Sequence, residues 1–248
     1  MIFVKNTPNH AGVAIYGDQL DFHNLYEALH DIVGSDEECE RYYSARIRVL
    51  GVCYDLRHAL MGDREIEFVD NGIDDDMRRY MAVIAPDKNV YFKINVLWPE
   101  ILFVTMVLND FILLYAQKKA KLKYDVLSDK QNIWDPSIAA VRSFQAAVAG
   151  LIKETVSNSS FSRMMNLMNE RYWAEDYTWQ YLDVLNCRFL EMDSEKRSKS
   201  LLTMVKRLVE RGQEYQTLRA TIKASAKHYN TWEDNIKAPV DYPEDIEW

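Results

Sequence analysis

Two histidines and two carboxylic acids near the start of the chain have the spacing of a metal site. His23, Glu27 and His30 lie four and three residues apart, and Asp31 follows. An α-helix would project the first three from one side, and neutral imidazole and carboxylate suit iron, manganese or zinc. We therefore predict His23, Glu27, His30 and Asp31 as candidate ligands of a divalent metal. The alternative is the solvated flank of an amphipathic helix that holds no cofactor, which the neighbouring apolar stripe favours.

Around this pair, residues 28–34 read ALHDIVG, which resembles the His-Asp step of the HD-domain phosphohydrolases. That resemblance implies a helical, metal-dependent phosphohydrolase in which His30 and Asp31 help to hold metals that activate water. The sequence departs from the family pattern in two ways. Only His10 and His23 precede the pair, and no motif marks a later aspartate.

An acidic run, DNGIDDD at residues 70–76, is a second group with metal-binding chemistry. Clustered carboxylates attract calcium or magnesium. The spacing is not that of an EF-hand loop, and a turn followed by an acidic helix start explains the same residues without a metal.

Charge is unevenly distributed along a chain whose net charge is −8. Residues 194–229 hold nine Lys and Arg against three Glu, a net +6. We predict that Lys196, Lys199, Lys206 and Arg207 are the candidate contacts for nucleic acid or another anion. The overall acidity and the apolar face of this segment favour the simpler interpretation, the wet side of an amphipathic helix.

The segment after residue 229 combines acids with aromatic side chains. Residues 230–248 hold six acids against one lysine, a net −5. Trp232, Tyr242 and Trp248 could anchor this tail on a protein surface. The opposed charges predict that the tail lies along the protein's own basic helices, or along those of a second copy. The alternative is a frayed end.

The elements that must position these groups indicate an α+β protein that is predominantly helical. We expect a small antiparallel sheet, made of an N-terminal hairpin and central strands, packed against a helical C-terminal half. The first helix begins at Asp21 as its N-cap and ends at Gly34. The next carries one apolar stripe to Gly62. That stripe consists of Cys39, Tyr43, Ile47, Leu50 and Tyr54.

Later segments follow the same logic. Residues 64–70, 80–84 and 90–97 are predicted strands, the last two joined as a hairpin, and Pro99 starts a long, deeply buried helix. We divide the chain into an α+β part at 1–117, a connecting segment at 118–133, a helical part at 134–229 and the acidic aromatic tail at 230–248. All of these could form one compact domain.

Composition indicates the compartment. The three cysteines are too far apart for a disulfide framework or a zinc site, which predicts a reducing, cytoplasmic environment. The N-terminus lacks the pattern of a signal peptide. Acids and amides interrupt the most apolar region, so we expect no membrane span.

Three stretches resemble an uncharacterised family of bacterial cytosolic proteins. They are NTPNH at 6–10 with Gly12 and Val13, MGDREI at 61–66, and WPEILF at 98–103. This resemblance implies no activity.

The sequence lacks the common catalytic fingerprints, including Walker, dinucleotide-binding, G-x-S-x-G and H-E-x-x-H motifs. We therefore predict a protein that acts through protein contacts, self-associates and is not an enzyme. A metal-dependent hydrolase at the early histidines and a nucleic-acid binder at 194–229 remain the alternatives.

Overall fold

The computed structural model describes residues 1–81, 85–121 and 124–248, without the side chain of Cys39. The described strands form an antiparallel sheet in the order β1-β2-β4-β3. They are β1 (Phe3–Asn6), β2 (Gly12–Gly17), β3 (Glu65–Asp70) and β4 (Lys88–Leu97). The predicted α+β class and antiparallel sheet are confirmed.

A capping box starts the first helix, α1 (Gln19–Val33). The Asp18 carboxylate accepts a hydrogen bond from the Asp21 N–H at 2.8 Å, and the Asp21 carboxylate accepts one from the Asp18 N–H at 3.1 Å. Asp21 is therefore not the N-cap, as we predicted, but the third helical residue. Each of the two carboxylates accepts a hydrogen bond from the other residue's backbone N–H. This pairing fixes the N-cap of α1 at Asp18, three residues before the predicted position.

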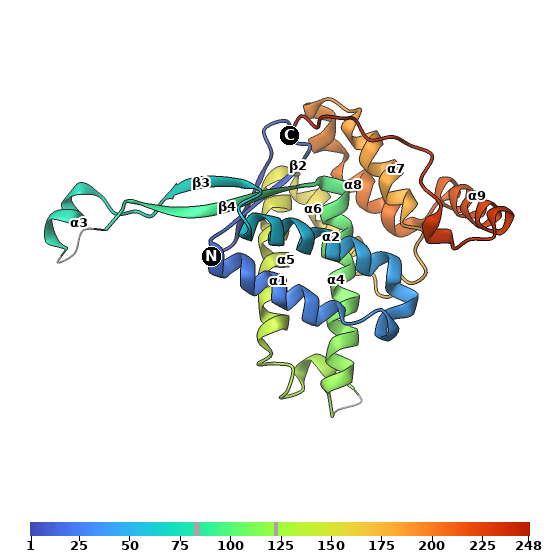
Figure 1. Cartoon of the computed structure of the whole chain (residues 1–248), viewed down its shortest axis with the longest axis horizontal. Coiled ribbons are helices and arrows are strands. Elements are labelled where there is room, and N and C mark those ends of the chain that lie inside the picture. The colour runs from blue at the N-terminus through green and yellow to red at the C-terminus, as the bar shows by residue number, and fades with distance from the viewer. Residues whose placement is uncertain (82–84, 122–123) are drawn as a thin grey trace.

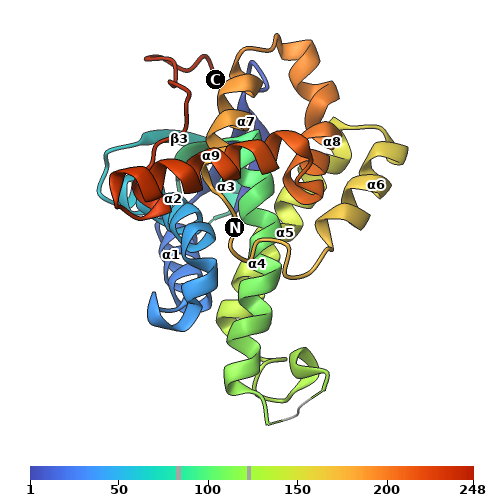
Figure 2. The same ribbon diagram turned by 90° about the vertical axis from the view of Figure 1, so that its right-hand side faces the viewer.

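The long apolar helix is the centre of the protein. It is α4 (Trp98–Lys119), and Pro99 occupies its first turn, as predicted. The chain continues with α2 (Tyr43–Leu60), α5 (Pro136–Thr155), α6 (Asn158–Met168), α7 (Gln180–Leu190), α8 (Ser194–Glu210) and α9 (Gln213–Tyr229), with 3₁₀ turns η1 (Glu37–Tyr42), η2 (Val126–Ser128) and η3 (Glu233–Asn235). Helices α1, α2, α5, α7 and α8 pack around α4, whereas α9 lies at the edge of the molecule (Figures 1 and 2).

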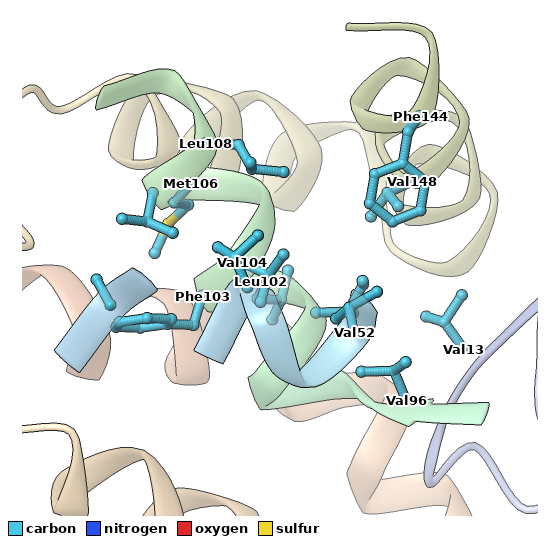
Figure 3. Packing of buried hydrophobic residues seen from close by; sticks show 14 of the residues in the cluster. Val13, Val52, Val96, Leu102, Phe103, Val104, Met106, Leu108, Phe144 and Val148 are labelled. Carbon is cyan, nitrogen blue, oxygen red and sulfur yellow. The ribbon is translucent and has the colours of Figure 1, made fainter. Parts of the chain in front are cut away.

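One continuous core joins the sheet to helices from both the N-terminal and the C-terminal half of the chain. Val13 and Val96 from the sheet, Val52 from α2 and Phe144 from α5 surround the buried side chains of α4 (Figure 3). By length and composition α4 could cross a membrane, but 72% of its apolar window is buried in the protein. It is used here as a core helix.

The face of α2 that packs inward is not the one we expected. Its small and aliphatic side chains are buried, whereas Tyr43, Ile47 and Tyr54 are exposed and Leu50 is half-buried. The inward set consists of Ala45, Val49, Val52, Cys53, Leu56 and Ala59. Small residues allow α2 to approach its neighbours closely, so the bulkier stripe is left outside.

A long arm projects from the body of the protein (Figure 1). It consists of β3, the short helix α3 (Asp75–Tyr80) and the outer part of β4. The predicted strand 80–84 is wrong at Tyr80, which ends α3, and residues 82–84 lie outside the described residues. In the arm, β4 pairs instead with β3, with Glu65 opposite Lys93 and Asp70 opposite Lys88.

Candidate functional site

The early histidines do not form a metal site. His30 packs against Tyr26 in a tilted arrangement, with ring centroids 4.5 Å apart, and Asp31 accepts a hydrogen bond from the Ser137 hydroxyl at 2.8 Å. Among the residues that the structure describes, no group of three His, Cys, Asp or Glu side chains could hold a metal ion. His23, Glu27, His30 and Asp31 are thus not brought together as ligands.

The acidic run serves local structure. Asp70 accepts a hydrogen bond from the Gly72 N–H and Asp74 one from the Met77 N–H, both at 2.7 Å. Asp76 lies 3.2 Å from Arg79. These contacts match the turn and acidic helix start that we weighed against a metal.

Of the four predicted anion contacts, two are paired within their own helix. Lys196 lies 3.0 Å from Asp193, and Lys199 lies 2.5 Å from Glu195. Lys206 is exposed, while one terminal nitrogen of Arg207 is buried and has no hydrogen-bond partner among the described residues. The same segment buries its apolar side, which indicates an amphipathic helix.

The aromatic tail lies mainly along α7. The Tyr242 hydroxyl donates to Asp183 at 2.8 Å and accepts from the Asn186 amide at 2.9 Å. The carbonyl of Trp248 accepts a hydrogen bond from the Asn9 N–H at 2.9 Å. Trp232 remains 79% exposed, beside a cavity that basic side chains of α9 also line. The first residues of the tail therefore lie near the basic segment, and the later residues of the tail lie along α7.

A buried ionic cluster lies beside α2, under Tyr242. Arg48 donates to Glu100 at 3.2 Å and to Asp183 at 2.6 Å. Its guanidinium carbon lies 4.7 Å from the centre of a Trp179 ring. One cation thus serves two carboxylates, which leaves the cluster with a net charge of −1.

Burial controls the proton affinity of this cluster. It raises the pKa of Glu100, although Arg48 and Asn186 oppose the rise. It also raises the pKa of Tyr242, so this hydroxyl stays protonated and donates to Asp183. A cavity of about 450 Å³ adjoins the cluster, and Ile47 and Gly51 of α2 line its outer side.

The exposed side of α2 continues this region as an apolar stripe. Tyr43, Ile47, Tyr54 and Met61 lie four, seven and seven residues apart, so they follow one side of the helix. All four are exposed, Ile47 by 45% and Tyr54 by 52%. We call these four side chains the α2 stripe.

The arm carries a second apolar surface. Ile66 lies opposite Phe92, and Phe68 opposite Val90, so all four side chains are on one face. Phe92 packs near Phe22 of α1, with ring centroids 6.1 Å apart. This face therefore continues the one that α1 covers in the body. Farther out, it is open, and Phe68 is 65% exposed.

Sequence comparison places the chain among known proteins. A family model described as a domain of unknown function (DUF6904) matches residues 2–248. The chain belongs to this family. The prediction of a family without a known activity is thus confirmed. No curated protein and no solved structure matches the chain significantly.

In this member of the DUF6904 family, sequence reasoning missed the ionic cluster. Its three charged residues come from separate segments, and no spacing joins them. One signal was available, because Glu100 directly follows Trp98 and Pro99 at the start of a strongly apolar helix. A carboxylate there is buried and needs a cation.

Proposed function

We propose that this protein is a self-associating interaction module, in which the arm of one copy lies across the α2 stripe of a second copy. One observation carries the proposal: the core-facing side of the sheet runs onto the arm, where nothing in the described part of the chain covers Ile66, Phe68 and Val90. Apolar surface that is contiguous and open marks interaction sites.

The α2 stripe supports the choice of occupant. It offers aromatic and aliphatic side chains on a regular helix, which suits packing against a flat strand face. In a two-fold dimer each arm would reach the other copy's α2, so the dimer would contain two equivalent contacts that cover both apolar surfaces of each copy.

The outer edge of the arm does not suit strand-to-strand pairing. β3 is the edge strand of the sheet and carries Glu65, Glu67 and Asp70. Pairing two such strands would place carboxylates of two copies side by side, and charged edge strands resist this. The face of the arm, rather than its edge, is therefore the docking surface.

Charge supports the same arrangement. Residues 65–88 hold seven acids and three bases, a net −4. Beside the α2 stripe, Arg57 stacks on Tyr54, with its guanidinium carbon 5.6 Å from the ring centre. No carboxylate among the described residues pairs with Arg57. An acidic arm and an unpaired arginine favour contact between copies.

The described thiols support a reducing location. Cys53 and Cys187 are free and buried, and burial raises the pKa of Cys53 to about 12. Buried thiols of this kind act as small apolar side chains. We propose a cytoplasmic location on this basis.

Sedimentation equilibrium tests the proposal. The unaltered chain should form dimers, and Phe68→Ser should weaken them on the order of 100-fold, because the loss occurs at both contacts. Glu67→Ser is the matched control, since it changes the adjacent residue on the opposite face. A chain that stays monomeric at every concentration, or a Phe68→Ser variant that associates normally, contradicts the proposal.

Mixing two variants identifies the receiving surface. Phe68→Ser damages the arm, and Ile47→Ser damages the α2 stripe, so each variant alone should be monomeric. The mixed dimer contains one contact in which an intact arm, from the Ile47→Ser copy, faces an intact α2 stripe, from the Phe68→Ser copy. It should therefore form more strongly than a dimer of either variant alone. No gain on mixing would refute contact between these two surfaces.

A further inference from the structure

A groove with both polar and apolar lining lies on the side of α4 that α5 and α6 flank, away from the ionic cluster. Its volume is about 490 Å³. Asn109 of α4 links the three helices, because its amide nitrogen donates to the Met168 carbonyl at 3.2 Å and its oxygen accepts from the Gln145 amide at 3.1 Å. The groove is therefore built on rigid helices.

Arg142 of α5 is the charged group of this groove. One of its terminal nitrogens, Nη1, donates to the amide oxygens of Asn109 and Gln145, the latter at 3.0 Å. These acceptors orient the guanidinium but carry no charge. No carboxylate among the described residues lies within ion-pair distance of it. Arg142 is exposed at the groove, and partial burial of its guanidinium lowers its pKa, as expected for a cation that lacks a counter-ion.

The remaining donors of Arg142 are available to a ligand. Its Nε and Nη2 make no hydrogen bond within the described ranges, and a guanidinium presents such donors as a planar fork that fits an oxyanion. Thr105 adds a second polar group at the floor. This side chain lines the groove and is 5% exposed, and its hydroxyl has no hydrogen-bond partner in the described chain.

Apolar side chains line the groove beside Arg142. Met165 and Met168 belong to α6, and Ala146 and Ala149 belong to α5, the same helix as Arg142. Methionine side chains adapt to flexible apolar groups. The groove thus combines one oriented cation with an apolar wall.

We propose that this groove binds a small organic acid, with its carboxylate on Arg142 and a short apolar chain against Met165 and Met168. A bidentate carboxylate would supply the negative charge that the protein itself does not provide there. Side-chain amides at the rim, on Asn166 and Asn169, offer further hydrogen bonds.

Titration calorimetry with hexanoate tests the proposal on the full chain. Hexanoate should bind, and hexanol, which has the same chain without the charge, should not. Arg142→Gln should weaken hexanoate binding at least about tenfold, because it removes the charge-assisted hydrogen bonds. Lys153→Gln is the matched control, since it removes one charge from the same helix outside the groove.

Circular dichroism of each variant shows whether it is folded, and Thr105→Val provides a second probe that keeps Arg142 in place. Thr105→Val should weaken hexanoate binding without altering the spectrum. Equal binding of hexanoate by the Arg142→Gln and unaltered proteins refutes the site. Tighter binding of inorganic phosphate than of hexanoate refutes the assignment of a carboxylate with an apolar chain.

Discussion

Replacing Arg48 with methionine should destabilise the protein in a strongly pH-dependent way. Methionine keeps an aliphatic side chain but removes the cation that Glu100 and Asp183 share. The side chains of these three residues are 16%, 15% and 13% exposed. Removing one partner of a buried ion pair costs about 3 to 5 kcal/mol.

Proton binding gives an independent magnitude. The variant can avoid a buried charge by holding Glu100 neutral, although glutamate ordinarily titrates near pH 4.3. At about 1.36 kcal/mol per pH unit, this costs about 3.7 kcal/mol at pH 7 and about 1 kcal/mol at pH 5. Folding raises the pKa of Glu100 in this variant. The variant therefore has its full stability below the ordinary pKa of glutamate, and it loses stability as pH rises. We therefore expect the deficit to shrink by about 2.7 kcal/mol between pH 7 and pH 5.

Urea unfolding followed by tryptophan fluorescence at pH 5, 6 and 7 measures this difference. Protein concentration must be constant, since association shifts apparent stability. Adding Glu100→Gln to Arg48→Met removes one of the carboxylates and should recover most of the loss at pH 7. A deficit that is equal at pH 5 and pH 7, or a total loss below about 1 kcal/mol, would refute the assignment of a buried ionic cluster.

Three other predictions, two of them with a comparison variant, test separate features of the fold. Burial raises the pKa of Asp110 to about 6, so its ionisation disfavours folding as pH rises towards neutrality. Asp110→Asn should stabilise the protein by about 1 to 2 kcal/mol at pH 7, after allowance for solvent screening, and leave it unchanged at pH 4, as urea unfolding would show. A Cβ atom on Gly12 would clash with the backbone oxygen of Val96 on β4. Gly12→Ala should therefore cost about 3 kcal/mol by thermal unfolding, whereas Gly150→Ala, in open space on α5, should stabilise the helix by up to about 1 kcal/mol. Tyr242→Phe removes two hydrogen bonds and should cost about 1 to 2 kcal/mol, while Tyr229→Phe, at an exposed position, should leave the melting temperature unchanged.

Periodicity predicted much of the architecture because burial imposes it on each element locally. The alternation of Val90, Phe92 and Ile94 identified β4, and the apolar run after Pro99 identified the buried helix. The α2 stripe shows where this reasoning fails. Two apolar faces compete on α2, and close packing selects the one with small side chains.

The candidate sites were harder to predict than the elements. The early histidines share one helix face, but His23 is exposed and His30 packs against the ring of Tyr26. The ionic cluster draws its three charged residues from three helices, α2, α4 and α7. Arg142 is oriented by side-chain amides on two helices, α4 and α5. Only the packing of α4 against its neighbours brings these groups together, so no local pattern reveals them.

The sequence distance between interacting groups has a kinetic consequence. Arg48 and Asp183 are separated by 135 positions, and Asn9 in the β1–β2 turn meets Trp248. Such contacts require large chain loops to close before they return any energy. We expect refolding to pass through a collapsed species in which α4 is already enclosed while the tail is still unattached, and the slowest phase to report the docking of Tyr242.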